Sequence, residues 1–547
     1  MQTRLLTLVL LTTPSLLAGQ QPCPMDVTEL ANVPSVGANS LMGLSPAIAS
    51  ENRFAFVSGG RLNGDRFVLH YQQTNDWVGV QEITAGTPPQ GTEVFGTDVA
   101  FDFASLTLAI TSAPAGLGTD PGRVHLYGLV GGVWVEQQVL TSPYGLTNRF
   151  GASVDIDGDR MVVGAPGGSA SNAAIYRRVS GSWVFDESLD PALTVIGAGL
   201  SGRFGEDVAI RDNLVLAGDP TFADVLSVQG TGAPPPVTGC VWSFREDGFG
   251  NYGLWQYVQE PNPQVLVDFG ASLDFDGEHL IVGAPLDSLT VFRQGAAHLY
   301  DLNSGDTFLD DVRLDANPVA TGIQCGFDVA ISGSYAVVGC PTVFFANQGE
   351  FHVYEEDASG NWSPSAGPLF PPGAMAGDGV GAVLEIESTQ LLVVSPGDTT
   401  AGQGTGTFST WSLNGADCPS LMGNPSVISE SVGGTQVLVA DAGSAFGGSL
   451  FQMLGSFSGT QPGIPIGSLN LPLVPDAYFN LLLTSPPPGF TGVLDSLGRA
   501  QIPVVVAPGA GPGLIGLTLN HAYLVFANGP TPGVVFASEA EPLLIIG

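Results

Sequence analysis

The feature that most constrains the fold of this chain is a pattern that recurs at intervals of 53 to 65 residues. Each copy starts with Phe-Gly or a variant, alternates apolar and polar residues, turns, and ends in an apolar run before Gly-Ala-Pro or a variant. The clearest copies span Phe150–Pro166 and Phe269–Pro285. Such self-similarity indicates a repeat architecture. Seven copies align on the glycines Gly43, Gly96, Gly151, Gly205, Gly270, Gly326 and Gly381.

Each unit also has a second half that is typical of a β-hairpin. In one example, Gly122–Tyr127 is followed by Trp134 and Leu140. Alternating apolar positions, β-branched and aromatic residues and short glycine turns favour hairpins. Four short antiparallel strands in about 55 residues match the size of one propeller blade. One such sheet cannot bury both faces, whereas seven packed radially can, so the sequence predicts an all-β, seven-bladed β-propeller.

The Phe-Gly…Gly-Ala-Pro copies, each followed by a Gly…Tyr…Trp…Leu hairpin, resemble the FG-GAP repeats of the integrin-α N-terminal propeller and its secreted bacterial relatives. The resemblance covers roughly residues 24–416 and implies a seven-bladed propeller. It also implies that ligands bind on the face formed by the loops before each Phe-Gly and after each Gly-Ala-Pro. A Gly/Pro-rich insertion over Thr221–Gly239, which lengthens the fourth unit, lies on that face and is the candidate ligand contact. A tolerated surface insertion is the alternative.

The last unit has three strands, and the chain leaves the repeat after Leu413. Residues 25–32 have the spacing of an outer strand relative to the first unit. We therefore expect them to complete the seventh blade by pairing with the strand that carries Trp411. Closure of this kind ties the two ends of the propeller together. The expected domains are a propeller over residues 20–417 and a C-terminal module over 418–547.

The C-terminal module lacks the repeat and contains apolar segments between Gly/Pro turns. These segments predict a small β-sandwich of about 130 residues. The expected strands are Val427–Val432, Gln436–Ala440, Ala477–Leu483, Ala500–Val506, Ala522–Phe526 and Gly533–Phe536.

The charge balance and the N-terminus predict the compartment and exclude some partners. Acidic residues outnumber basic ones 51 to 15, which gives a formal net charge of −36, and every basic residue is Arg. Such a charge repels nucleic acid and anionic lipid, whereas it is compatible with divalent cations and basic partners. Residues 1–19 resemble a secretory signal peptide, and no later segment is long and apolar enough to span a membrane. We therefore expect a secreted or cell-surface protein without a transmembrane anchor, and a monomer.

Five cysteines in an exported chain allow two disulfides. Cys23 and Cys418 flank the two strands that would close the ring, so a bridge between them is expected, with two unrelated cysteines as the alternative. Cys325 and Cys340 lie opposite each other if Ser332-Gly333 forms the two-residue turn. A bridge is favoured there over two free thiols. Cys240 is left as a buried apolar residue.

Asp155, Asp157 and Asp159 alternate around Gly158 and are weak candidates for a calcium site. The resembling family's calcium loop is longer, and a cation needs six to eight oxygens, so we expect turn acids exposed to solvent. The short copy with Asp274, Asp276 and Glu278 gives the same expectation.

Repeated histidines and tryptophans are expected to be packing residues rather than ligands or binding platforms. Repeat-equivalent positions lie in different blades, so the histidines cannot converge on one metal. The residues are His125, His298 and His352, with Trp77, Trp134, Trp183, Trp255 and Trp362.

The sequence contains no nucleophile elbow, zinc spacing, phosphate loop or dinucleotide fingerprint, so it predicts no catalytic residue and no cofactor apart from possible calcium. The first hypothesis is an exported, non-enzymatic propeller that acts in adhesion or binds an extracellular protein or glycan. The second is a polysaccharide lyase or hydrolase on the same scaffold. Convergent polar groups at the central channel would favour the enzyme. Near that position lie Asp98, Glu206, Asp207 and Asp328, in different blades.

Overall fold

A computed structural model shows that the chain divides into two compact units, one over Met25–Asn414 and one that contains Gly415–Gly547. The expected signal peptide and Cys23 lie outside the described residues. The structure describes residues 28–546 except 35–39, 43–47, 52–53, 62–65, 74–76, 115–119, 146–147, 168–171, 190, 192–201, 224–236, 261–266, 304, 317, 319, 342–346, 358, 372, 388, 398–405, 414–419, 425–426, 443–445, 461–462, 467–468, 496–497, 528–532 and 539.

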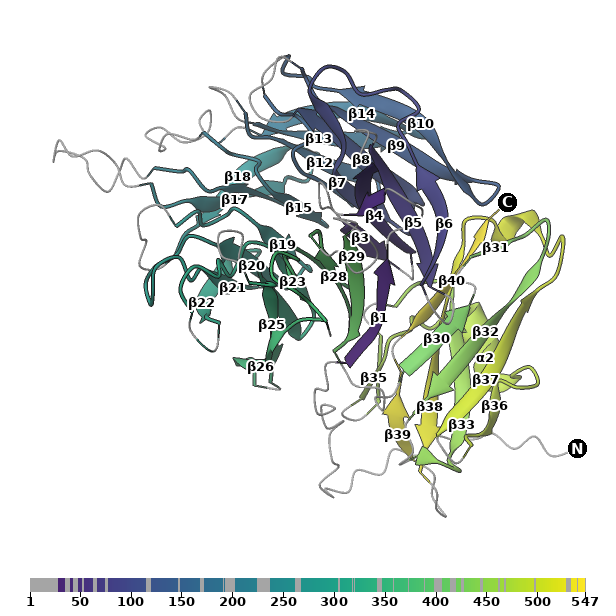
Figure 1. Cartoon of the computed structure of the whole chain (residues 1–547). Coiled ribbons are helices and arrows are strands. Elements are labelled where there is room, and N and C mark those ends of the chain that lie inside the picture. Colours follow the sequence, from purple (N-terminus) through teal and green to yellow (C-terminus); the bar gives the residue numbers. More distant parts are fainter. Residues whose placement is uncertain are drawn as a thin grey trace, which may run out of the picture. The chain divides into compact units, whose positions relative to one another are not determined.

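The first unit consists of seven antiparallel sheets, numbered here along the chain (Figure 1). Sheets 1 to 4 contain β2 (Ser40–Met42), β3 (Ile48–Glu51), β4 (Phe54–Arg61), β5 (Arg66–Gln73) and β6 (Trp77–Ile83); β7 (Glu93–Asp102), β8 (Thr107–Pro114), β9 (Arg123–Val130) and β10 (Val133–Thr141); β11 (Val154–Asp157), β12 (Arg160–Ala165), β13 (Asn172–Val179) and β14 (Ser182–Leu189); and β15 (Val208–Arg211), β16 (Leu214–Asp219), β17 (Cys240–Glu246) and β18 (Tyr252–Val258). Sheets 5 to 7 contain β19 (Leu273–Phe275), β20 (His279–Ala284), β21 (Ala296–Leu302) and β22 (Phe308–Leu314); β23 (Val329–Ser332), β24 (Tyr335–Cys340), β25 (Glu350–Glu356) and β26 (Trp362–Leu369); and β27 (Val383–Glu387), β28 (Gln390–Ser395), β29 (Thr407–Ser412) and β1 (Thr28–Pro34).

The innermost strands of these sheets follow one another around a closed circle. In chain order, β3, β7, β11, β15, β19, β23 and β27 each contact the next strand, and β27 contacts β3. Buried apolar residues from neighbouring sheets share common cores; one such core contains Val162 of β12 and Val215 of β16. Radial packing of this kind buries both faces of small sheets, as a propeller requires.

The N-terminal strand completes the last sheet. β1 pairs antiparallel with β29, and Glu29 lies opposite Trp411. This pairing agrees with the expectation, although β1 covers 28–34 rather than 25–32. A register shift lies between Glu29 and Ala31.

The repeated Phe-Gly and Gly-Ala-Pro motifs form the contact between neighbouring sheets. A Cβ atom on Gly164, in Gly-Ala-Pro of sheet 3, would lie 2.1 Å from the carbonyl oxygen of Gly205, in Phe-Gly of sheet 4. At Gly283 the corresponding distance, to the carbonyl oxygen of Gly326, is 2.2 Å. Both are far below contact distance, so only glycine allows these backbones to approach so closely.

The first hairpin of sheet 6 turns one residue later than the sequence analysis expected. Ser332 pairs with Tyr335, so the turn residues are Gly333 and Ser334, and Gly333 has the positive φ of 55° that this turn needs. The N–H of Gly326 donates to the carbonyl of Gly339, and the N–H of Gly339 donates to the carbonyl of Asp328. This two-residue offset is a bulge that still brings Cys325 and Cys340 together.

The second unit contains a three-stranded sheet, β30 (Ser420–Asn424), β32 (Gly434–Asp441) and β37 (Arg499–Val506). A larger sheet contains β31 (Val427–Ser429), β33 (Leu450–Ser456), β36 (Thr491–Val493), β38 (Thr518–Phe526), β39 (Val534–Ala537) and β40 (Glu541–Ile546), and β34 (Ile464–Ile466) pairs with β35 (Leu469–Leu471). One core joins the two larger sheets, since Leu438 and Ile502 of the first are buried with Met453 and Tyr523 of the second.

One expected strand of this unit is a helix. Residues Ala477–Thr484 form α2, and the short 3-10 helix η3 covers Pro512–Leu514. Asp476 caps α2, because its Oδ1 accepts a hydrogen bond from the N–H of Phe479 at 2.8 Å. Phe479 and Leu482, three residues apart, are its buried positions, a helical spacing that the continuous apolar run concealed. In the described part of the chain, no helix has the length and apolar character needed to cross a membrane.

Candidate functional site

The circle of innermost strands surrounds a cavity of about 660 Å³. Residues from β7, β11, β15, β19, β23 and β27, or from the segments just before them, form most of its wall. Among the described residues that line it, Arg211 is the single basic side chain. The acidic ones are Asp98, Asp102, Asp155, Asp157, Glu206, Asp207, Asp274, Asp276, Asp328, Glu385 and Glu387.

Five of these carboxylates connect the innermost strands of neighbouring sheets. In each, Oδ2 accepts a hydrogen bond from a backbone N–H in the innermost strand of the following sheet, at 2.7–2.8 Å. Hydrogen bonds to a carboxylate are stronger than bonds between neutral groups, so these bonds hold the innermost strands of neighbouring sheets together. The pairs are Asp98 with Val154, Asp155 with Ile210, Asp207 with Leu273, Asp274 with Ile331, and Asp328 with Leu384.

The second oxygen of these carboxylates is also engaged. Oδ1 of Asp98 accepts from the N–H of the following residue, Val99, at 2.9 Å. Asp155, Asp207 and Asp274 make the same local bond. Asp98, Asp207 and Asp328, which the sequence placed in different blades, therefore meet in one cavity, but their oxygens are bonded to the backbone.

The calcium candidates Asp155 and Asp157 hold sheets together. Oδ2 of Asp157 accepts from the N–H of Asp212 at 2.5 Å, and Asp155 also pairs with Arg211 at 2.9 Å. The expectation of turn acids exposed to solvent is therefore wrong for these two residues. It fits Asp159, whose side chain is 68% exposed. Three carboxylates on one hairpin, two of them bonded to backbone amides, do not supply the oxygens of a calcium loop.

Removal from water inside the cavity raises the pKa values of the ring carboxyls. The pKa of Asp98 is raised to about 7, first by desolvation and further by the nearby Asp155. Desolvation likewise raises the pKa of Asp328 to about 7 and of Asp274 to about 6. The pKa of Asp207 is raised well above its usual range for the same reason. These groups bind protons over a pH range in which ordinary carboxyls are ionised.

A Ser–His–Glu chain lies inside sheet 2. Oγ of Ser112 is 3.0 Å from Nε2 of His125, and Nδ1 of His125 is 2.8 Å from Oε1 of Glu136. These distances match those of a nucleophile–base–orienter arrangement. However, the side chains of Ser112 and His125 have no exposed surface, so a substrate cannot reach Oγ. Burial also lowers the pKa of His125, which keeps the ring neutral.

The other two repeated histidines are buried in separate sheets, as the sequence analysis expected. His298 lies in sheet 5 beside Glu260 and Asp287. His352 lies in sheet 6 beside Cys325 and Cys340, which form a disulfide. Cys240 is free and buried, as expected. Cys418, like Cys23, lies outside the described residues, so the bridge between them stays a prediction.

Glutamine side chains fix the outer strands of neighbouring sheets. The amide of Gln138 in sheet 2 donates to the carbonyl of Trp183 in sheet 3 at 2.7 Å and accepts from its N–H at 2.9 Å. Gln81 makes the same pair of bonds with Trp134. These two tryptophans are buried packing residues, as expected.

Trp255 differs from the other repeated tryptophans. The side chains of Trp134, Trp183 and Trp362 are buried, whereas Trp255 is 45% exposed. Tyr252, three residues earlier, takes the buried position, and its N–H donates to Glu187 of sheet 3 at 2.7 Å. Trp255 is therefore not buried between blades as expected, although it contacts the turn of sheet 5 through Asp306.

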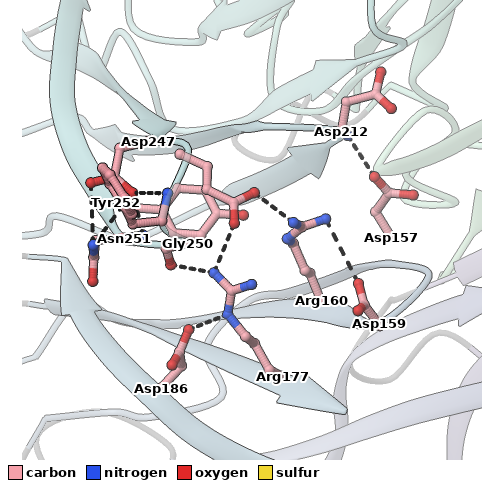
Figure 2. Close-up of polar contacts among 12 residues, drawn as sticks. Asp157, Asp159, Arg160, Arg177, Asp186, Asp212, Asp247, Gly250, Asn251 and Tyr252 are labelled. Atoms are coloured by element: carbon pink, nitrogen blue, oxygen red, sulfur yellow. Dashed lines mark hydrogen bonds and ion pairs between the residues drawn. The ribbon is translucent and has the colours of Figure 1, made fainter. Parts of the chain in front are cut away.

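Ion pairs on the turn side of sheets 3 and 4 form a second inter-sheet contact (Figure 2). Glu246 accepts from Arg160 at 2.5 Å and from Arg177 at 3.0 Å. Arg177 also pairs with Asp186 and donates to the carbonyl of Gly250. Partial burial acts to raise the pKa of Glu246, but the two arginines hold it below the usual value.

A hollow of about 480 Å³ lies on the hairpin of β17 and β18. Its lining includes Trp255, Asp247 and Asn251. The guanidinium of Arg245 lies 4.8 Å from the centre of the Trp255 ring, and the indole N–H donates to the carbonyl of Asp306 at 2.6 Å. These contacts hold an exposed aromatic ring in one orientation.

The Gly/Pro-rich insertion Thr221–Gly239 lies mostly outside the described residues. Its two described ends meet, since Ala223 and Val237 form an antiparallel bridge. A role for it in ligand contact stays a prediction.

Comparison with known families assigns the repeat. Residues 134–176 match the model of the FG-GAP repeat family. The matched segment contains Phe150-Gly151 and Gly164–Pro166, the motifs that form the inter-sheet contact. The chain therefore contains an FG-GAP repeat over residues 134–176.

The chain is similar to several solved structures at low identity. A candidate 6-phosphogluconolactonase from Bacteroides uniformis has a TM-score of 0.41 at 12% identity, covering 60% of this chain and 86% of that one. The periplasmic gluconolactonase of Pseudomonas aeruginosa has a TM-score of 0.36 at 14% identity, covering 69% and 96%. The β-propeller domain of the trilobed protease from Pyrococcus furiosus has a TM-score of 0.40 at 9% identity, covering 68% and 96%. Such values carry no information about activity, and no curated protein matches the sequence.

Proposed function

We propose that this FG-GAP repeat protein is an exported, non-enzymatic, seven-bladed propeller that binds an extracellular protein or glycan. Each of the seven sheets would be one blade, and the closed circle of innermost strands supports that reading. The second unit would be a small β-sandwich, in keeping with the core that its two larger sheets share. The disulfide in sheet 6 favours an oxidising compartment.

The observation that carries the binding proposal is an exposed aromatic residue of β18, Trp255, whose side chain is 45% exposed. Tyr257, which is 46% exposed, lies on the other face of sheet 4, where its ring is 5.5 Å from that of Trp242. Arg245 lies against the Trp255 ring, and the hollow beside it offers the polar side chains of Asp247 and Asn251. Exposed Trp, Tyr and Arg side chains that are held in place dominate the binding energy of many interfaces.

Two observations weigh against an enzyme. The Ser112–His125–Glu136 chain is closed to substrate. The five aspartates that link the innermost strands accept backbone hydrogen bonds, so they serve the architecture rather than a reacting group. The lyase or hydrolase alternative would need another catalytic pair.

The test is a binding screen of the full chain against glycans and extracellular proteins, with and without calcium. Trp255→Ala should weaken binding at least tenfold, whereas Tyr257→Ala, on the other face of the sheet, should weaken it less, and both variants should keep the β-sheet circular dichroism of wild type. Val184→Ala, at an exposed apolar position of β14, is the matched control and should bind normally. Binding that all three variants retain would overturn the assignment of the surface.

The same protein preparation also tests whether the chain is an enzyme. Incubation with a polysaccharide panel should release no product, and a fluorophosphonate probe should not label Ser112. Turnover that Asp98→Asn abolishes would contradict the non-enzymatic proposal. Export is tested by sequencing the N-terminus of protein recovered from outside the cell, which should begin near residue 20.

A further inference from the structure

The disulfide of sheet 6 lies within a set of metal-binding side chains. Cys340 ends β24 and lies directly opposite Glu350 of β25, and His352 follows two residues later. Because alternate residues of a strand share a face, Cys340, Glu350 and His352 lie on one side of the sheet. Cys325 joins them from the segment before β23.

The ligand atoms of this set are close together. One ligand atom from each of Cys325, Cys340 and His352 lies within 4.8 Å of the others. Nε2 of His352 is 3.1 Å from Oε1 of Glu350, so a carboxylate borders the same place. All but Glu350 are buried, and the Glu350 side chain is 12% exposed. Two thiols, one imidazole and one carboxylate are ligands that tetrahedral zinc accepts.

We propose that reduction of the Cys325–Cys340 disulfide creates a zinc site formed by Cys325, Cys340 and His352, with Glu350 or water as the fourth ligand. A dithiol reductant breaks the S–S bond by supplying two electrons, and it becomes a disulfide itself. Its two thiol protons pass to the sulfurs of Cys325 and Cys340. Binding of Zn²⁺ then forms two Zn–S bonds of about 2.3 Å and releases both protons.

The surroundings favour metal over free thiolates. Cys325 and Cys340 are fully buried among apolar residues, including Ile323 and Val338. An isolated thiolate pair would be strongly destabilised there, so the reduced sulfurs either keep their protons or bind a cation. The disulfide and the metal use the same sulfur atoms, so the two states exclude each other.

A second cluster of potential metal ligands, in sheet 5, is already paired with an arginine. Glu260, Asp287 and His298 also bring their ligand atoms together. There, however, Arg313 donates to both oxygens of Asp287, at 2.8 and 3.0 Å. The guanidinium already supplies the positive charge, so this cluster is not a metal site. In sheet 6, by contrast, His352 pairs with the carboxylate of Glu350.

The test uses the full chain with the triple substitution C23S/C240S/C418S, so that Cys325 and Cys340 are its only thiols. The protein is reduced with a phosphine, freed of reductant and titrated with Co²⁺, which reports thiolate ligation by its charge-transfer absorption. We expect one Co²⁺ per chain, displaced by Zn²⁺, and no absorption before reduction. His352→Ala should weaken binding at least tenfold. His298→Ala, a buried histidine in the corresponding place of sheet 5, is the matched control and should bind normally.

Three results would overturn the proposal. The first is a reduced, folded protein with no charge-transfer band. The second is a band of equal affinity in the His352→Ala variant. The third is a reduced protein that loses its β-sheet circular dichroism and does not regain it with Zn²⁺. Binding of Zn²⁺ to the folded state should also raise the melting temperature of the reduced protein, which gives a readout independent of cobalt.

Discussion

Oδ2 of Asp207 accepts a hydrogen bond from the backbone N–H of Leu273 at 2.8 Å, and this bond joins sheet 4 to sheet 5. Neighbouring sheets of this chain share only isolated backbone bridges, such as that between Gly295 and Cys325, so side chains make many of the other contacts between them. In this chain the acidic residues of the innermost strands make those contacts. A large part of the negative charge around the cavity therefore has a structural role.

Asp155→Ala should destabilise the first unit by about 1–3 kcal/mol, because the N–H of Ile210 loses its acceptor and Arg211 loses its ion pair. Urea unfolding followed by tryptophan fluorescence measures the change. Asp159→Ala is the control, since that side chain is mostly exposed, and it should lie within about 0.5 kcal/mol of wild type. Equal effects of the two substitutions would contradict the structural role of Asp155.

The stability of the first unit should fall as the pH rises from about 4 to about 8. Asp98 and Asp328 have folded-state pKa values of about 7, above an unfolded value of about 3.9. Over that range the folded state binds more protons than the unfolded state, so a rise in pH favours unfolding. The double variant D98N/D328N should flatten the dependence, since Asn keeps an acceptor oxygen without a titrating proton. Melting temperatures of the wild type and of the double variant, measured across the pH range, give the two pH dependences. A wild-type melting temperature that is highest near pH 8 would contradict the prediction.

Gln138→Ala should destabilise the contact between sheets 2 and 3 by about 1–3 kcal/mol, because it leaves both backbone groups of Trp183 without partners. Gln137→Ala is the neighbouring control. The amide of Gln137 bonds to the carbonyl of Val135 in its own strand and is exposed, so its loss should change stability little. Chemical denaturation of the two variants provides the comparison. A larger loss for Gln137→Ala would show that the inter-sheet bonds contribute little.

Gly164→Ala should be the more damaging of two alanine substitutions in sheet 3, with a loss of at least about 3 kcal/mol. The new Cβ would lie 2.1 Å from the carbonyl oxygen of Gly205, so sheets 3 and 4 would have to separate. Gly158→Ala meets no atom within 4 Å, and its positive φ of 59° should cost only about 1–2 kcal/mol. Thermal unfolding of both variants tests the ranking, and equal losses would show that the close approach is easily relieved.

Periodicity carried most of what the sequence predicted correctly. The Phe-Gly and Gly-Ala-Pro spacing located the strands of the first unit, and the FG-GAP assignment followed from it. Counting from Gly43 placed an N-terminal strand beside Trp411, as observed. These features repeat, so each copy corrects the interpretation of the others.

Features that depend on the next sheet could not be predicted. Nothing in the local pattern of Asp155 or Asp157 shows that their acceptors face backbone amides more than fifty residues later. Trp255 lies three residues after the buried aromatic position, and only the pairing of Tyr252 with Glu187 reveals the offset. One signal was available for the carboxylates: an acidic residue recurs two or four positions after the aligned glycine, as at Asp98 and Asp155.

The pairing of β1 with β29 also governs how the protein can be assembled. Thr28 faces Ser412, which is translated 384 positions later. During synthesis β1 has no strand to pair with until β29, the last strand of the first unit, has left the ribosome. A chain that stops short of β29 would keep an open edge at both ends, and that edge is where a chaperone or a neighbouring nascent chain would attach.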